Sequence, residues 1–124
     1  MSAPETISID NVKYVREDSI KRNQPAISTD GLQAVIVRSQ SAGVFAGYLK
    51  EQKERVVTLH DCRRLWYWSG AFTLSEIAND GVSKPKQCKF SCCVDTHIIL
   101  DASEIIPMTQ SAAESVFGVP EYTA

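Results

Sequence analysis

The chain has 124 residues, and its 13 basic and 15 acidic side chains give a formal net charge of −2. A length of this order supports one domain, because two would leave neither half enough residues for a core. Proteins that hold genomic nucleic acid through its phosphates usually carry an excess of basic residues, so we expect no such partner. No run approaches the roughly 18 apolar residues of a membrane span, and we expect no membrane association.

The start of the chain and the cysteines indicate the compartment. Residues 1–5, Met-Ser-Ala-Pro-Glu, lack the basic start and apolar stretch of a secretory signal. Among the four cysteines, Cys92 and Cys93 are neighbours within an apolar run. That setting is typical of buried, reduced thiols and not of a disulfide framework. We therefore expect a cytoplasmic protein.

The first 31 residues are predicted to form an arm and a linker. Apolar and polar residues alternate over residues 6–16 on both sides of Asp10-Asn11, which is the pattern of a short β-hairpin. Such a hairpin is marginal alone, so it should add to a larger sheet or to a neighbouring subunit. Residues 17–31 are polar and interrupted by Pro25 and Gly31. A single domain is then expected over residues 32–124.

Strands dominate the first half of this domain. Residues 33–39, 44–50 and 55–60 are rich in β-branched and aromatic side chains and are joined by short polar connections. This is the signature of an antiparallel meander. Residues 61–71 have an aromatic density that favours another strand, with a short helix from Asp61 as the alternative.

The second half mixes helices with further strands. Thr73 and Glu76 fit a capping box that opens a helix, which should stop before Gly81. Residues 89–94, 96–101 and 104–106 read as strands, and Thr109 opens a helix that ends at residue 115 or 116. The fold class expected is α+β, an antiparallel meander of about five to seven short strands with two short helices and the N-terminal hairpin arm.

The segment 63–69, Arg-Arg-Leu-Trp-Tyr-Trp-Ser, is the strongest candidate for a binding site. On a strand, Arg64, Trp66 and Trp68 would share one face. A guanidinium beside two indoles can pair with a phosphate and stack a base. The alternative is that the same aromatic side chains fill the core or anchor a subunit interface. The candidate ligand-binding residues are Arg64, Trp66, Trp68, Arg63, Arg38 and Ser69.

Catalytic, metal and cofactor sites are not expected. A nucleophilic pair could be assembled from Cys62 or Cys93 and a histidine, but nothing in the flanking sequence would activate such a thiol. His97 is better explained as a half-buried strand residue. The cysteine spacing is unlike the close pairs that bind zinc, and the carboxylates are scattered. We therefore predict a protein that is not an enzyme, with no catalytic residue, no metal and no cofactor.

Three runs resemble a family of small uncharacterised phage and prophage proteins. These are residues 37–44 (Val-Arg-Ser-Gln-Ser-Ala-Gly-Val), residues 63–71 (Arg-Arg-Leu-Trp-Tyr-Trp-Ser-Gly-Ala) and residues 105–107 (Ile-Ile-Pro). The resemblance covers roughly residues 33–117. Residues 12–19 are similar to a short piece at the start of other phage proteins, which implies a portable docking or oligomerisation element.

For a small phage protein without catalysis, the resemblance implies two kinds of function. One is to bind a ligand or a host factor, as a host-defence antagonist that binds a defence protein or sequesters a cyclic-nucleotide signal. The other is a structural or protein-interaction module, a virion accessory or assembly protein with the Trp-rich face as its subunit interface. In both cases we expect a homo-oligomer, and the partner is a nucleotide-type small molecule or a protein.

Overall fold

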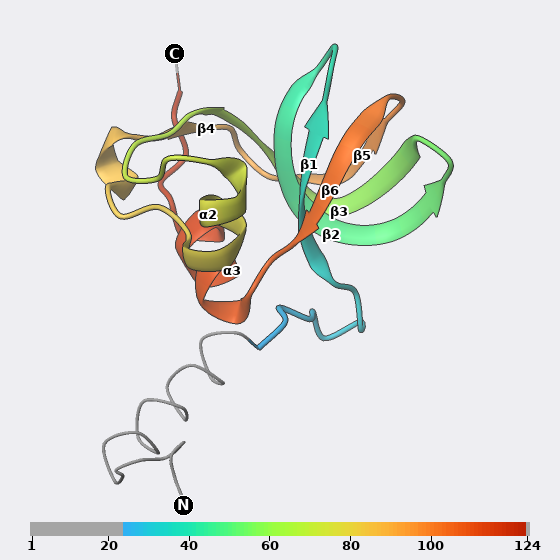
Figure 1. Ribbon diagram of the computed structural model, residues 1–124, viewed down its shortest axis with the longest axis horizontal. Coiled ribbons are helices and arrows are strands. Elements are labelled where there is room, and N and C mark those ends of the chain that lie inside the picture. The colour runs from blue at the N-terminus through green and yellow to red at the C-terminus, as the bar shows by residue number, and fades with distance from the viewer. Residues whose placement is uncertain (1–23, 124) are drawn as a thin grey trace, which may run out of the picture.

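The computed structural model describes residues 24–123 and has an α+β fold with one sheet and two α-helices in that part of the chain (Figure 1). The predicted hairpin arm lies outside the described residues. In chain order the elements are β1 (Ala34–Ser39), β2 (Gly43–Lys53), β3 (Val56–Tyr67), α2 (Leu74–Asp80), the 3-10 helix η1 (Pro85–Gln87), β4 (Lys89–Phe90), β5 (Val94–Ile99), β6 (Ala102–Pro107) and α3 (Gln110–Phe117).

The six strands form a strongly curled antiparallel sheet. Its main path is β4-β3-β2-β1-β6, and β5 pairs with the other part of β3. Only Leu100 and Asp101 separate β5 from β6, although these strands border opposite ends of the β3-β2-β1 meander. The curl of β2 and β3 brings the two ends together, while α2 and α3 lie to one side of the sheet (Figure 1).

Two hydrophobic cores lie on the two faces of the sheet. Along β1, Ala34 and Ile36 belong to the core that includes the helices, and Val35 and Val37 belong to the core inside the curl. All four side chains are at most 1% exposed. Burial on both faces explains why this strand reads as a continuous apolar run without alternation.

β3 is one twelve-residue strand, whereas the sequence pattern predicts separate segments over 55–60 and 61–71. Asp61 has a positive φ of 50° and lies at an irregularity in the β2–β3 pairing. Gly47 lies opposite, and a Cβ atom there would be 3.1 Å from the Cβ atoms of Leu59 and Cys62. The strand therefore bends at Asp61 without breaking, because a bulge absorbs the extra residue.

Both helix starts agree with the sequence prediction. The Thr73 hydroxyl accepts a hydrogen bond from the Glu76 amide at 3.1 Å, and the Thr109 hydroxyl accepts one from the Ala112 amide at 3.1 Å. Gly81, with φ 79°, ends α2 as expected. Two strands have other bounds than the predicted segments 89–94 and 96–101. β4 covers only Lys89–Phe90, and β5 begins at Val94.

Residues 24–31, which are predicted from the sequence to be part of a linker, pack against the domain. Ala26 is 1% exposed and belongs to the core beside the helices. Its amide donates to the Met108 carbonyl at 3.1 Å, and its carbonyl accepts from the Ala34 amide at 2.8 Å. This segment therefore connects the start of β1 to the end of β6.

The Arg63 side chain joins three parts of the fold from inside the protein, where it is 3% exposed. Its Nε donates to the Ser91 carbonyl at 2.9 Å. Its Nη1 donates to the carbonyls of Val116 and Val119, at 3.2 and 2.8 Å. A cation at the C-terminal end of α3 is favoured both by the free carbonyls and by the helix dipole.

Arg63→Met is expected to lower the free energy of unfolding by about 3 kcal/mol, because buried carbonyl oxygens lose a charged donor. Urea unfolding measures this change. Arg64→Met is the matched control, since Arg64 is exposed and contacts the Phe45 ring at 4.8 Å. An exposed cation–π contact is worth about 1 kcal/mol or less. Equal losses in the two variants would contradict the structural role of Arg63.

Asp101 joins the β5–β6 turn to the end of β1. Its carboxylate accepts hydrogen bonds from the hydroxyls of Ser39 and Ser41, the latter at 2.7 Å, and from the Ser41 amide at 3.2 Å. The hydrogen bond from Ser39, followed by that from Ser41, lowers the pKa of Asp101 below its ordinary value. The folded state therefore favours the charged form.

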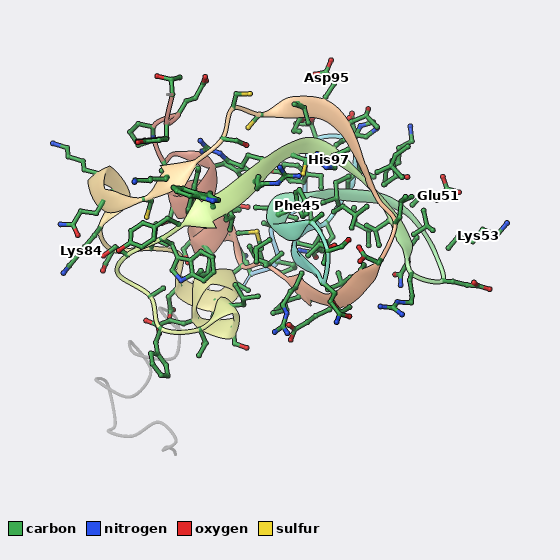
Figure 2. All side chains as sticks on the ribbon, turned by 90° about the horizontal axis from the view of Figure 1, so that it is seen from above. Phe45, Glu51, Lys53, Lys84, Asp95 and His97 are labelled. Atoms are coloured by element: carbon green, nitrogen blue, oxygen red, sulfur yellow. The ribbon has the colours of Figure 1, made fainter. Side chains whose placement is uncertain are left out.

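Because this pKa is lowered on folding, the Asp101 carboxylate stabilises the protein above its unfolded pKa of about 4. The stabilisation is lost as the pH falls through the folded value. Asp101→Asn should therefore be less stable than the wild type at pH 7, and the difference should shrink in acid, as measured by thermal unfolding against pH. Asp95→Asn is the control, because Asp95 projects from β5 into solvent (Figure 2). A difference that stays constant down to the acid limit would contradict this role for Asp101.

Candidate functional site

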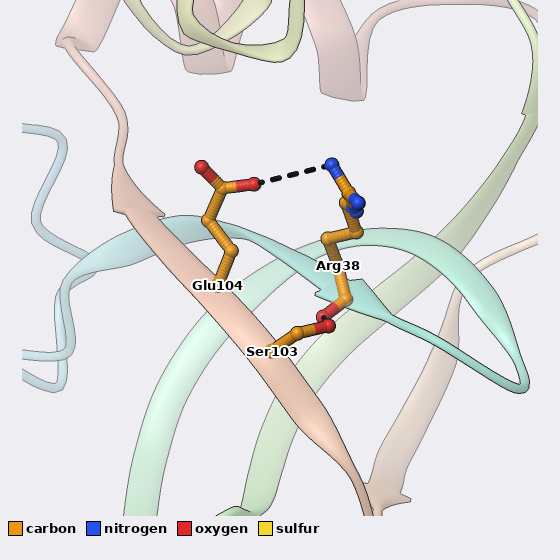
Figure 3. A network of polar contacts seen from close by, with 3 residues as sticks. All are labelled: Arg38, Ser103 and Glu104. Atoms are coloured by element: carbon orange, nitrogen blue, oxygen red, sulfur yellow. Dashed lines mark hydrogen bonds and ion pairs between the residues drawn. The ribbon is translucent and has the colours of Figure 1, made fainter.

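The six predicted site residues lie in separate environments. Arg38 is on β1, and its side chain is 60% exposed and 3.8 Å from the Glu104 carboxylate on β6 (Figure 3). The Ser103 hydroxyl donates to the Arg38 carbonyl at 3.1 Å. Arg38 therefore forms part of a polar contact between β1 and β6, and β2 lies between it and β3.

The two arginines of the segment lie on opposite faces of β3, as predicted for a strand. Arg63 and Leu65 are buried toward the helices, and Arg64 and Trp66 are exposed. All the contacts of the Arg63 guanidinium described above are internal, so it does not reach a surface ligand. Arg64 contacts Phe45 inside the curl, near His97.

Trp68 and Ser69 follow the end of β3 and have structural contacts. Trp68 is half-buried and packs against the core beside the helices. The Ser69 hydroxyl donates to the Gln87 side chain at 3.2 Å, and its amide donates to the Cys88 sulfur at 3.4 Å. An irregularity between Leu65 and Tyr67 in the pairing with β4 breaks the strand alternation, so Trp66 and Trp68 do not form one platform.

Trp66 instead belongs to a surface that we call the Trp66 face, made of Trp66, Lys89, Phe90, Ser91 and Tyr122. These residues surround a shallow hollow of about 300 Å³. The Trp66 side chain is 69% exposed and that of Tyr122 is 51% exposed. The Lys89 ammonium lies 5.2 Å from the centre of the Trp66 ring and 5.1 Å from that of Tyr122. One cation is thus in range of two aromatic faces.

Backbone pairing holds these residues in place. Leu65 pairs with Phe90 and Tyr67 pairs with Lys89 across β3 and β4. On the other side, Phe90 forms a parallel bridge with Glu121, and the Tyr122 amide donates to the Phe90 carbonyl at 2.9 Å. The C-terminal segment therefore adds to the outer edge of β4 and carries Tyr122 beside Lys89.

The sequence pattern does not indicate that Lys89 and Tyr122 belong to this surface. They are separated from Trp66 by 23 and 56 positions, and no local motif links them. Their neighbours, a two-residue strand and an isolated bridge, are too short to show a period. Only the pairing of β3, β4 and the C-terminal segment brings the three side chains together.

The polar groups of the Trp66 face differ in whether they are available to contact a ligand. The Ser91 hydroxyl accepts from the Arg64 amide at 2.8 Å and donates to the Cys92 carbonyl at 2.9 Å. The Lys89 ammonium is the charged group at the hollow. The face can therefore cover an apolar or flat group and attract a neighbouring anion, but Ser91 has no free proton to donate.

The cysteines are all free in the described part of the chain, and they differ in burial. Cys62 and Cys88 are buried, but the expectation of burial is wrong for Cys92 and Cys93, which are exposed between β4 and β5. Burial, followed by the nearby Cys93, raises the pKa of Cys62 to about 12. Cys62 therefore stays a thiol at neutral pH and is a poor nucleophile.

His97 is a half-buried strand residue, as predicted. Its ring lies 4.6 Å from that of Phe45, at an interplanar angle of 56°. Burial, followed by the positive charge of Arg64, lowers the pKa of His97 below its ordinary value. Among residues 24–123, no three His, Cys, Asp or Glu side chains gather closely enough to hold a metal ion.

The helices of the described residues are short, with seven residues in α2 and eight in α3. None of them has the length and apolar character that a membrane crossing needs.

Comparison with known proteins gives one family. No curated protein matches the chain, and no solved structure matches it. A family model described as a domain of unknown function (DUF6948) matches residues 32–116. This range agrees closely with residues 33–117, over which the sequence resembles an uncharacterised family. The chain belongs to the DUF6948 family, a domain of unknown function.

Proposed function

We propose that this domain is a non-enzymatic binding protein whose Trp66 face holds a protein partner. The observation that supports this most directly is the Trp66 side chain, which is 69% exposed on a paired strand. Aromatic side chains of this kind anchor protein interfaces, because they bury a large area and lose little conformational entropy. Tyr122 and Lys89 enlarge the same surface.

We also propose that the protein comes from a phage or prophage. The resemblance of residues 33–117 to phage and prophage proteins supports a role in the cytoplasm of an infected host. There the Trp66 face would bind a host defence protein or a subunit of a phage assembly. We also propose self-association, because the exposed rings of Trp66 and Tyr122 can pack against the same face of a second copy.

A nucleotide-type ligand is the second candidate. The hollow of about 300 Å³ has a cation between two aromatic rings, which suits a phosphate and a stacked base. Against it, the arginines proposed for phosphate contacts do not converge on the hollow: Arg63 is buried and Arg38 contacts Glu104. The protein partner is therefore the better-supported proposal.

Trp66→Ala is expected to dissociate the homo-oligomer in native mass spectrometry, because it removes the central anchor of the face. Phe72→Ala is the matched control, since it also removes an exposed ring but lies outside the Trp66 face. It should weaken assembly much less. An oligomer that survives Trp66→Ala unchanged would show that another surface mediates self-association.

Cyclic nucleotides at high excess are expected to leave the melting temperature unchanged. A ligand at one hundred times its Kd would stabilise the folded state by about 2.7 kcal/mol, which is a shift of about 10 °C for a domain of this size. Differential scanning fluorimetry with a cyclic-nucleotide panel measures this directly. A shift that Trp66→Ala and Lys89→Met both abolish would favour the nucleotide candidate over the protein partner.

A further inference from the structure

A second hollow shares Tyr122 with the hollow of the Trp66 face. It has a volume of about 230 Å³, and Tyr122 lines both hollows. The residues around the second hollow are Pro85, Lys86, Cys88, Pro120, Glu121 and Tyr122. We propose that the two hollows form one groove that binds an extended, acidic, proline-containing peptide segment, with one apolar side chain on each side of Tyr122. This inference rests on the proposed function, that the Trp66 face holds a protein partner.

The shape of the groove supports an extended peptide. Tyr122 is half exposed and lines both hollows, so in the proposed groove its ring is the ridge between them. The hydrogen bond from its amide to the Phe90 carbonyl fixes the backbone at this position. Phe90, which is fully buried, lines the first hollow, and Cys88, 6% exposed, lines the second. Aromatic and prolyl walls of this kind receive segments in the polyproline II conformation, which are already extended before binding.

The charge of the groove supports an acidic segment. Lys86 and Lys89 line the two hollows, and Lys84 lies with Lys86 around a further hollow beside η1. The charged residues that line the two hollows are Lys86, Lys89 and Glu121, so the lining of the groove carries a local charge of +1 although the whole chain has a net charge of −2. A cationic patch on an acidic protein attracts carboxylates by electrostatic complementarity.

Single-stranded nucleic acid, the other class of partner for aromatic and lysine side chains, fits less well. The net charge of −2 opposes a polyanion at long range. Reading a base edge also needs free hydrogen-bonding groups, and the Ser91 hydroxyl is already engaged by Arg64 and Cys92. Proline rings give apolar pockets but little of the stacking surface that bases use.

Trp66 provides a direct reporter, because the chain has two tryptophans and Trp68→Phe leaves Trp66 alone. In this background, a short synthetic peptide with a Pro-Glu-Glu-Pro centre should change the Trp66 fluorescence in a saturable way. A peptide with a Pro-Lys-Lys-Pro centre should not. Tyr122→Ala should weaken binding about tenfold or more, because it removes the ridge that both anchors contact.

Charge reversal tests the electrostatic part. Lys86→Glu should weaken binding of the acidic peptide, and Lys53→Glu is the matched control. Lys53 lies at the opposite end of the molecule from Lys84 (Figure 2), so its reversal should leave binding unchanged. Melting temperatures of all variants establish that each one is folded.

Three results would overturn the inference: equal binding of the acidic and basic peptides, tighter binding of oligothymidylate than of the acidic peptide, or no fluorescence change at millimolar peptide. If no peptide binds while Trp66→Ala still dissociates the oligomer, the groove inference fails and the proposed function stands. If Trp66→Ala also leaves assembly intact, the proposed function fails with it.

Discussion

The buried guanidinium of Arg63 is the interaction on which the rest of the structure depends. It bonds to the Ser91 carbonyl directly after β4 and to the Val119 carbonyl directly before the C-terminal segment. These two segments carry Lys89 and Tyr122, and β3 itself carries Trp66. One internal side chain therefore links β3, the chain after β4 and the C-terminal segment. Exposed side chains of these three parts form the Trp66 face. A positive charge is tolerated there because several carbonyl oxygens surround it.

Strand geometry lets one short segment serve both the core and the surface. Successive residues of β3 point to opposite faces, so Arg63 and Leu65 are internal while Arg64 and Trp66 are exposed. The pairing irregularity before Tyr67 then turns Trp68 toward the core beside the helices. The arginine and tryptophan residues that lie close together in the sequence are therefore in three different environments in the structure. Composition alone does not separate them.

The sequence predicted the features that depend on neighbouring residues. Thr73, Gly81 and Thr109 bound the helices as expected, because caps act over three or four positions. It failed where distant segments decide the outcome. Arg63 caps a helix more than 50 positions away, and Tyr122 reaches the site through one isolated bridge. Cys92 and Cys93 were expected inside because their neighbours are apolar, but the chain between β4 and β5 leaves the sheet there and exposes both thiols.

The exposure of Trp66 is not explained by the needs of the fold. Leu65 and Phe90 fill the core at this end of β3, at 2% and 0% exposure, and Trp68 covers the core beyond the strand. A smaller or polar side chain at position 66 would leave these contacts intact. Exposing an indole instead retains apolar surface in water, which costs about 25 cal/mol for each Å² that could have been buried. Isolated apolar residues on a surface need no special reason, but here the indole adjoins Tyr122, Lys89 and a hollow. The arrangement is better explained by contact with a partner than by the stability of the domain itself.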